Sequence, residues 1–359
     1  MRIAQVAPLI ESVPPKGYGG TERVVSYLTE SLVELGHDVT LFAAGDSRTR
    51  AKLVPSIPRS VRLDPARPDW LMWQTMMIDR VFARAAEFDV IHFHVDYVHY
   101  LLSKHSRTPC VTTLHGRLDL PDLIPLHRHF HEQALVSISH SQRKPLADSR
   151  WIATVHHGLP DALYRFQPTP DDYFAFLGRI SPEKRVDRAI EIARATGTRL
   201  RIAAKVDPID EAYFESQIRP LLKHPLVDFV GEIDEVDKQA FLGNARALLF
   251  PIDWPEPFGL VLIEALACGT PVVAYRCGSV PEVIEHGITG FIVDDQQEAV
   301  EAARHIHRIS RLACRNAFER RFTARRMAQH YLAVYAALQG SETMISAPPA
   351  EPTAAASPT

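Results

Sequence analysis

The stretch YFAFLGRISPEKRVDRAIEIA, residues 173–193, carries the pattern that decides the fold class. It begins with an apolar run typical of a buried strand, turns at Gly178, and continues with apolar residues at helical spacing behind a Ser181–Pro182 helix start. Short apolar runs alternate with such helical patterns along most of the chain. This alternation predicts an α/β protein in which helices cover both faces of parallel sheets.

Two series of these elements follow one another. The expected strands of the first series are RIAQVAP, VTLFAA, VIHFH, CVTTLH, LVSIS and IATVHH, and those of the second are YFAFLG, LRIAAK, VDFVG, ALLFP, PVVAY and GFIVD. At 359 residues the chain is too long for one ordinary core. We therefore predict two doubly wound, Rossmann-like domains, whose strand carboxyl ends face a central cleft.

The domain boundaries follow from a proline-containing stretch without clear period between the two series. We predict a first domain at residues 1–160, a linker at 161–172, and a second domain at 173–321. A helix at 322–338 has no strand after it. A tail at 339–359, rich in Ala, Pro, Ser and Thr, is expected to be disordered.

The composition narrows the class of partner. The chain has 40 Lys+Arg against 43 Asp+Glu, so no nucleic acid is expected as a partner. Its four cysteines are scattered without a C-x-x-C pair, and no signal peptide or run of about 18 apolar residues is present. We expect a cytoplasmic protein. Arg128, His129 and Lys144 would suit peripheral contact with an anionic acceptor or a membrane, although such charge runs are usually solvated.

The stretch WPEPFGLVLIEALACGTPVV carries two carboxylates, one in a loop and one in a helix. The helix is expected to begin near Gly259, so Glu256 precedes it and Glu264 lies one to two turns inside. The amides around Phe258, Gly259 and Leu260 would then point their N–H groups into the cleft, where they can hold phosphate. Both carboxylates could accept hydrogen bonds from vicinal hydroxyls. A solvated surface role is the alternative, but Glu264 has apolar neighbours, and a buried carboxylate needs donors.

The motif GRISPEK brings cations to the end of a strand. Arg179 stands at the strand end, and Lys184 and Arg185 are expected in the first turn of the next helix, where cations oppose the helix dipole at about 0.3–1 kcal/mol each. An anion bound nearby would offset that cost by pairing with the cations. Arg179 and Lys184 would clamp a diphosphate and neutralise it as a leaving group. Surface pairing with Glu183 or Asp187 is the alternative.

The first half offers a glycine loop and a histidine at a strand end. Gly17, Gly19 and Gly20 stand between the first strand and its helix, where glycine permits close backbone approach to a ligand. Glu22 replaces the third glycine of a dinucleotide fingerprint, which counts against a nicotinamide dehydrogenase. His115 ends the strand CVTTLH and would face the cleft, although a lone histidine is more often structural.

A cluster of histidines raises the question of a metal. His92, His94, Asp96 and His99 lie close in sequence, and the first two would share one face of a strand. No matching ligand motif accompanies them. We expect no metal site.

Taken together, these stretches resemble the family 4 retaining glycosyltransferases, which have the GT-B fold. The resemblance extends to about Leu338 and rests on GYGGTE, TLHG, GRISPEK, EPFGLVLIE, ACGTPVVAYRCGSVPEVIEHGITGF and RFTARRMAQHYLAVY, in the order of the family. It implies transfer of a sugar from a UDP- or GDP-linked donor to an acceptor hydroxyl, without a metal or other cofactor. The acceptor is not implied.

The resemblance also implies roles for individual residues. Arg179 and Lys184 match the basic pair on the donor diphosphate, Glu256 the carboxylate on the transferred sugar, and Glu264 the carboxylate on the ribose. His115 matches the active-site histidine beside that sugar. The other donor-binding positions implied by the resemblance are Gly19, Gly20, Phe258, Gly259 and Leu260.

One residue departs from the family pattern. Arg185 stands where the family often has glycine, so the local loop shape is open. Two other classes of function also stay open at this point: another GT-B sugar-nucleotide enzyme, such as an epimerase or a phosphorylase, and a non-catalytic protein that binds sugar nucleotides.

Overall fold

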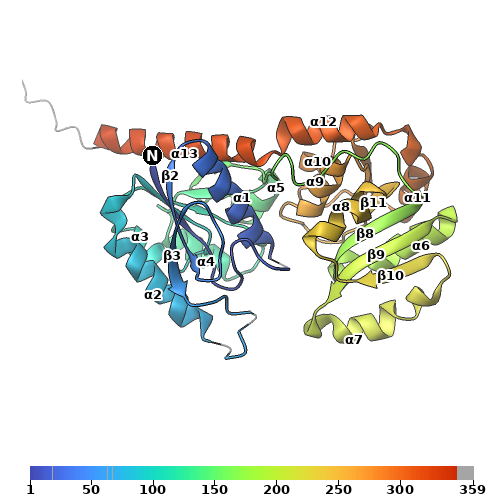
Figure 1. The fold of residues 1–359 in the computed structure, drawn as a ribbon, viewed down its shortest axis with the longest axis horizontal. Helices are drawn as coiled ribbons and strands as arrows, with labels where there is room; N and C mark the ends of the chain where they lie inside the picture. Colours follow the sequence, from blue (N-terminus) through green and yellow to red (C-terminus); the bar gives the residue numbers. More distant parts are fainter. Residues whose placement is uncertain (18, 63, 67, 346–359) are drawn as a thin grey trace, which may run out of the picture.

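In the computed structural model, the chain folds into two α/β units, each built on one sheet (Figure 1). The structure describes residues 1–345 except 18, 63 and 67. All strand pairs recorded in both sheets are parallel. The predicted α/β class with two doubly wound domains is therefore confirmed.

The first sheet has seven strands in the order β3-β2-β1-β4-β5-β6-β7. Its strands are β1 (Arg2–Val6), β2 (Asp38–Ala44), β3 (Lys52–Ile57), β4 (Val90–Phe93), β5 (Cys110–Thr113), β6 (Leu135–Ser137) and β7 (Trp151–Thr154). Its helices are α1 (Gly20–Glu34), α2 (Trp70–Ala83), α3 (Tyr100–Ser103), α4 (Leu123–His129) and α5 (His140–Arg143).

The second sheet has six strands in the order β10-β9-β8-β11-β12-β13. Its strands are β8 (Tyr173–Ile180), β9 (Arg199–Val206), β10 (Val227–Gly231), β11 (Ala247–Phe250), β12 (Val272–Tyr275) and β13 (Gly290–Val293). Its helices are α6 (Val186–Thr196), α7 (Glu211–Tyr213), α8 (Glu235–Gly243), α9 (Leu260–Cys268), α10 (Val280–Val283), α11 (Gln296–Arg304) and α12 (Arg311–Arg321).

Every strand segment expected from the sequence overlaps an observed strand, but β3 was not expected. Pro55 interrupts its apolar pattern and cannot donate a backbone hydrogen bond. The strand tolerates this proline because β3 lies at the edge of the sheet.

Helix α1 carries the glycine loop into the first domain. Val24, Leu28 and Leu32 recur at helical spacing and are buried. The helix begins at Gly20 with Gly19 as its N-cap. Gly19 takes φ 151°, a backbone conformation that favours glycine.

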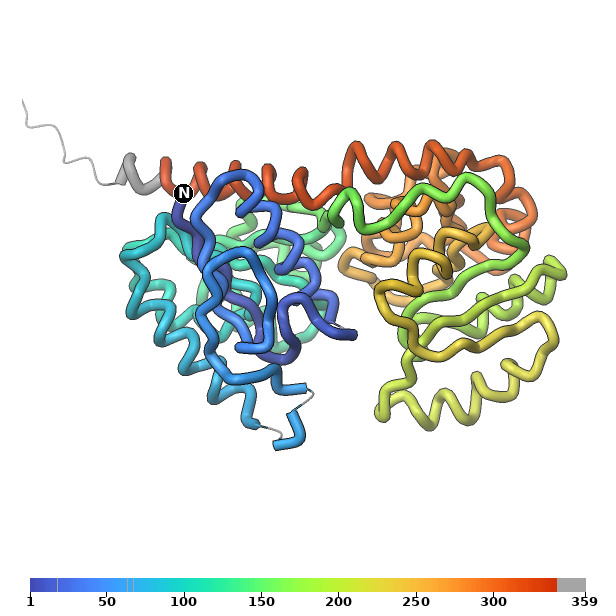
Figure 2. Tube along the Cα trace, viewed as in Figure 1, coloured from blue at the N-terminus to red at the C-terminus, as the bar shows by residue number. Residues whose placement is uncertain are grey.

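The chain passes between the units after β7 and again at the start of α13 (Ala324–Ile345), and these two segments lie side by side. Two backbone hydrogen bonds join them: Leu159 N–H donates to the Phe322 carbonyl at 2.9 Å, and Ala324 N–H donates to the Leu159 carbonyl at 2.7 Å. Helix α13 then runs back along the first domain, as Figure 2 shows in red. Its Met327 and Tyr331 share a buried cluster with residues of α1.

The far end of α13 differs from the sequence expectation. The helix extends to Ile345, so the end predicted at residue 338 is too early. Ala, Leu, Gln and Glu in this stretch are good helix formers, and Gly340 alone does not end the helix. The rest of the predicted tail, residues 346–359, lies outside the described residues.

The tight crossing generates a stability prediction. A Cβ on Gly158 would lie 2.3 Å from the carbonyl oxygen of Thr323. We expect Gly158→Ala to lower the free energy of unfolding by about 1–3 kcal/mol, because the two backbones must separate. Urea denaturation measures this change. Gly340→Ala is the control, since nothing lies within 4 Å of the added Cβ; equal unfolding free energies for both variants would contradict the account.

Candidate active site between the two domains

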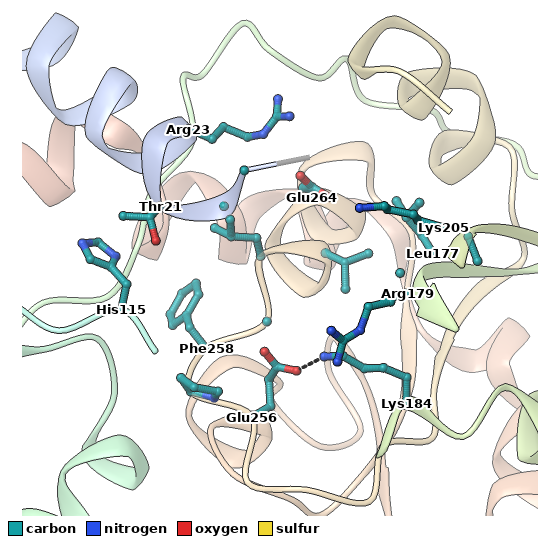
Figure 3. A pocket seen from close by; sticks show the side chains of 18 of the residues that line it. Thr21, Arg23, His115, Leu177, Arg179, Lys184, Lys205, Glu256, Phe258 and Glu264 are labelled. Carbon is teal, nitrogen blue, oxygen red and sulfur yellow. Dashed lines mark hydrogen bonds and ion pairs between the residues drawn. The ribbon is translucent and has the colours of Figure 1, made fainter. Parts of the chain in front are cut away.

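A cleft of about 570 Å³ lies between the domains, and both contribute to its walls (Figure 3). All the predicted site residues line it: His115, Arg179, Lys184, Glu256, Phe258, Gly259, Leu260, Glu264, Gly19 and Gly20. The structure thus brings into one cavity residues that are up to 245 positions apart in the sequence. Strand carboxyl ends and helix amino ends supply them.

The amino ends of α1 and α9 meet at this cleft. A Cβ on Gly20, the first residue of α1, would lie 3.7 Å from Cδ1 of Leu260, the first residue of α9. Both helices follow a glycine with positive φ, 151° at Gly19 and 78° at Gly259. The first amides of a helix have no intrahelical partner, and the helix dipole makes that end positive. The two ends together form a place for an anion.

The loop that carries Glu256 is held by hydrogen bonds from the turn at Gly278 and Ser279. Ser279 N–H donates to the Glu256 carbonyl at 3.0 Å, and the Ser279 hydroxyl donates to the Phe258 carbonyl at 2.9 Å. Gly278 has φ 56°, and a Cβ there would lie 2.4 Å from the Glu256 backbone nitrogen. Only glycine fits at that position, so the Gly278–Ser279 turn holds the Glu256 loop in place.

Lys184 forms an ion pair with Glu256 in the cleft (Figure 3). The Trp254 indole N–H donates to the same carboxylate at 3.1 Å, and the Lys184 ammonium lies 4.9 Å from the Trp254 ring centroid. The sequence offered Glu183 or Asp187 as surface partners. The observed partner of Lys184 is instead Glu256, so these two candidate site residues neutralise each other.

Arg179 is surrounded by carboxylates. It donates to Glu183 at 2.8 Å, and its guanidinium lies 3.7 Å from Asp207 and 3.5 Å from Asp210. Burial raises the pKa of Asp210, although Arg179 opposes the shift. The expected surface pairing with Glu183 is present, but Figure 3 shows that the guanidinium also points into the cleft.

The expected helix around Lys184 and Arg185 was wrong in its boundary. Lys184 ends a short 3-10 turn, η3 (Pro182–Lys184), and α6 begins only at Val186. Arg185 separates the two with left-handed φ 52° and ψ 50°, a conformation that favours glycine. Its guanidinium bonds to Asp187 at 2.8 Å and Asp253 at 2.9 Å. Arg185 is not among the described residues that line the cleft.

Glu264 is 3% exposed and receives a hydrogen bond from Lys238 at 2.9 Å. Lys238, on α8, is the donor that the burial of this carboxylate required. Sequence reasoning missed Lys238, and its only signal was the apolar surroundings of Glu264.

An ion pair also crosses the cleft. Arg23 on α1 contacts Glu235 at the start of α8, and the Tyr164 hydroxyl donates to the same carboxylate. Although burial acts to raise it, the pKa of Glu235 is lowered by Lys238 and Arg23. Because Lys238 contacts both Glu235 and Glu264, the link between the domains is continuous with the carboxylate in α9.

His115 follows β5 and stands at the first-domain wall of the cleft. Its Nε2 lies 2.8 Å from Nδ1 of His94, and its ring stacks on His157 with centroids 5.3 Å apart. Burial lowers the pKa of His115 to about 3. His94 and His157 were not predicted as neighbours of the site; the alternation of His92 and His94 on one strand face was the only sequence signal.

Two histidines of the sequence cluster, His92 and His94, bond to neutral partners. His92 bonds to Tyr335 and Thr113, each at 2.7 Å, and His94 bonds to Gln5 at 2.8 Å. Within the described ranges, no group of three or more His, Cys, Asp or Glu side chains could hold a metal ion. The His92 ring thus bonds to α13 through Tyr335, and the His94 ring bonds to His115.

Comparison with known proteins assigns the family. The family model for Glycosyltransferase Family 4 matches residues 18–147, and the family model for Glycosyl transferases group 1 matches residues 165–323. The two matches fall on the two domains in turn. The chain belongs to the family 4 glycosyltransferases.

Individual relatives agree with this family. The glycosyltransferase is 26% identical to N-acetyl-alpha-D-glucosaminyl L-malate synthase of Bacillus anthracis, over 88% of this chain and 93% of the relative. It is 26% identical to phosphatidyl-myo-inositol mannosyltransferase of Mycolicibacterium smegmatis, over 84% and 83%.

Solved structures share the fold. AviGT4, a glycosyltransferase involved in avilamycin A biosynthesis, has a TM-score of 0.74 and 25% identity, over 95% of this chain and 98% of that chain. HepE of Anabaena, solved with UDP and glucose, has a TM-score of 0.71 and 19% identity, over 94% and 100%. The GT-B fold is thereby confirmed. Among the described residues, no helix is long and apolar enough to cross a bilayer.

The buried Lys238–Glu264 pair generates a prediction. Lys238→Ala leaves Glu264 without its cation, and we expect the free energy of unfolding to fall by about 1–3 kcal/mol. Adding Glu264→Gln should recover part of that loss, because no charge then stays buried. Lys223→Ala at an exposed lysine is the control, with a change below about 0.5 kcal/mol. Equal losses for Lys238→Ala and Lys223→Ala in urea denaturation would refute the pairing.

The buried imidazoles generate a pH prediction. Burial lowers the pKa values of His92, His94, His115 and His157, whereas the unfolded value is about 6.5. Below that pH the unfolded state binds more protons, so stability falls as pH is lowered, by up to about 1.4 kcal/mol per pH unit for each histidine. Urea denaturation at pH 7.5 and 5.5 measures the slope. A free energy of unfolding that is constant or higher at pH 5.5 would contradict the buried, neutral assignment.

Proposed function

We propose that the enzyme transfers a sugar from a nucleoside diphosphate sugar to an acceptor hydroxyl, with retention at the anomeric carbon and without a metal ion. The observation that carries the proposal is one cleft that combines two helix amino ends, Arg179 and Lys184 with the carboxylates Glu256 and Glu264. Cations and free amides suit a diphosphate, and carboxylates suit sugar hydroxyls.

The donor would lie across the amino end of α9. Its diphosphate would receive hydrogen bonds from the amides around Phe258, Gly259 and Leu260 and from Arg179 and Lys184. To reach the phosphate, Lys184 must leave its ion pair with Glu256. That exchange frees the Glu256 carboxylate for hydroxyls of the transferred sugar, so donor binding would prepare both residues together.

Glu264 would receive hydroxyls of the ribose beside Lys238. A carboxylate already held in one orientation loses little side-chain entropy when it binds. HepE of Anabaena, which shares the fold, was solved with UDP-glucose as well as with UDP and glucose. That complex supports a UDP-linked donor for this enzyme, with a GDP-linked donor as the other candidate from the family.

In the proposed reaction, the bond between the anomeric carbon and the diphosphate oxygen breaks as the bond to the acceptor oxygen forms on the same face. The acceptor proton passes to the departing phosphate oxygen. Arg179, Lys184 and the helix amides stabilise the negative charge that develops on that phosphate, which is the main contribution to catalysis. Glu256 serves hydroxyl binding in this scheme, so no covalent sugar–enzyme bond is needed.

The test is release of nucleoside diphosphate from UDP-glucose, UDP-N-acetylglucosamine and GDP-mannose in the presence of EDTA, with water or an added alcohol as acceptor. We expect release from at least one donor, and NMR of the fresh product should show the anomeric configuration of the donor. Arg179→Ala and Lys184→Ala should each lower turnover by about 10²–10³-fold, because each removes a positive charge that stabilises the departing diphosphate.

Matched controls separate this effect from general damage. Arg276→Ala removes an exposed arginine paired with Asp294, and Lys223→Ala removes an exposed lysine; both should retain turnover. Wild-type turnover in the Arg179 and Lys184 variants would refute the clamp. A product of inverted configuration would refute retention, and activity only after addition of a divalent metal would refute metal independence. Binding of these donors without any release would indicate a non-catalytic sugar-nucleotide protein.

A further inference from the structure

A continuous chain of hydrogen bonds leads from the cleft into the core of the first domain. His115 at the cleft bonds to His94 at 2.8 Å, His94 bonds to Gln5 at 2.8 Å, and Gln5 bonds to Tyr335 at 3.0 Å. Tyr335 bonds to His92 at 2.7 Å. The inner members, Gln5, His92, His94 and Tyr335, are at most 3% exposed, so their hydrogen bonds are shielded from water.

The chain continues across the sheet to a second tyrosine of α13. His92 Nε2 lies 2.7 Å from the Thr113 hydroxyl, which lies 2.9 Å from the Tyr331 hydroxyl. The residues come from the neighbouring strands β1, β4 and β5 and from α13, and Gln5 is the register partner of His92. Strand pairing therefore holds the members of this chain opposite one another.

The orientation of the Gln5 amide sets the direction of the hydrogen bonds from His115 to Thr113. Its Nε2 donates to Tyr335, so its Oε1 must accept from His94 Nε2–H. A neutral His94 protonated at Nε2 has a lone pair at Nδ1, so His115 must donate to it through Nε2–H. On the other side of Gln5, the Tyr335 hydroxyl then donates to His92 Nδ1, and His92 Nε2–H donates to Thr113.

We infer that His94, oriented by Gln5, is a positioning residue that holds His115 as a neutral imidazole protonated at Nε2. This inference rests on the proposed function only for its consequence in the reaction. The Nδ1 atom of His115 is buried and has no partner within the part of the chain that the structure describes. The geometry leaves that nitrogen unprotonated, so His115 takes part in sugar transfer as an acceptor of hydrogen bonds and not as a proton donor.

The surroundings keep the ring neutral from every side. The titratable groups that face His94 and His115 along these hydrogen bonds are the imidazoles of His92 and His157 and the phenols of Tyr331 and Tyr335. Burial raises the pKa of both tyrosines and lowers that of His157. In the described residues, no carboxylate is a hydrogen-bond partner of these rings, so no counterion supports an imidazolium.

The inference also gives α13 a role at the active site. Tyr335 belongs to the helix that crosses from the second domain to the first, and its hydroxyl holds the Gln5 amide in the orientation that His94 requires. Gln5→Leu removes the acceptor for His94. His94 is then no longer fixed as an acceptor, and His115 is expected to populate both neutral tautomers.

The test is NMR of the full chain with ¹⁵N-labelled histidine, with the His115 and His94 signals assigned from the variants His115→Asn and His94→Asn. In the wild type we expect His115 to be protonated at Nε2 alone from pH 8 to pH 5.5. In Gln5→Leu, the Nδ1 and Nε2 shifts of His115 should move toward each other. This measurement needs no substrate, so its failure is distinct from failure of the proposed transferase reaction.

Thr113→Val is the matched control. It breaks the chain beyond His92 but leaves the segment from Gln5 to His115 intact, so the His115 shifts should stay at their wild-type values. A wild-type His115 that is protonated at Nδ1, or that gains a proton between pH 8 and pH 5.5, would overturn the inference. Unchanged His115 shifts in a folded Gln5→Leu variant would overturn the role of Gln5 and His94.

Discussion

The meeting of two helix amino ends is the constraint around which the site is built. Gly20 of α1 and Leu260 of α9 approach each other from different domains, and each helix follows a glycine with positive φ. Their uncompensated amides create positive potential that neither domain would have alone. Leu260 also packs against the buried cluster that α1 shares with α13.

The charged side chains of the cleft are paired with one another. Lys184 pairs with Glu256, Arg179 lies among acidic side chains, and Lys238 holds Glu264. These pairs avoid the cost of unpaired charge in a half-buried cavity. A diphosphate sugar would offer phosphate oxygens to Lys184 and Arg179 and hydroxyls to Glu256 and Glu264, so each of these side chains would have a polar partner when the donor binds.

The sequence predicted the structure best where it could be read from residues close together in the chain. Alternation predicted both sheets, and the apolar neighbours of Glu264 predicted a buried carboxylate in need of a donor. The donor itself, Lys238, could not be found, because the packing of α8 on α9 is a tertiary contact without a sequence pattern. The left-handed backbone at Arg185 was missed because two aspartates hold an arginine where glycine is favoured. His115 was predicted, but its link to His94 required strand register.

The most direct test is a crystal structure of the protein with the nucleoside diphosphate that it binds most tightly among UDP, GDP and ADP. The account predicts a diphosphate at the amino end of α9, with Lys184 Nζ about 3 Å from a phosphate oxygen and no longer on Glu256. The ribose hydroxyls should lie on Glu264. A bound nucleotide that leaves the Lys184–Glu256 pair intact, with its phosphates away from the α9 amides, would contradict the account.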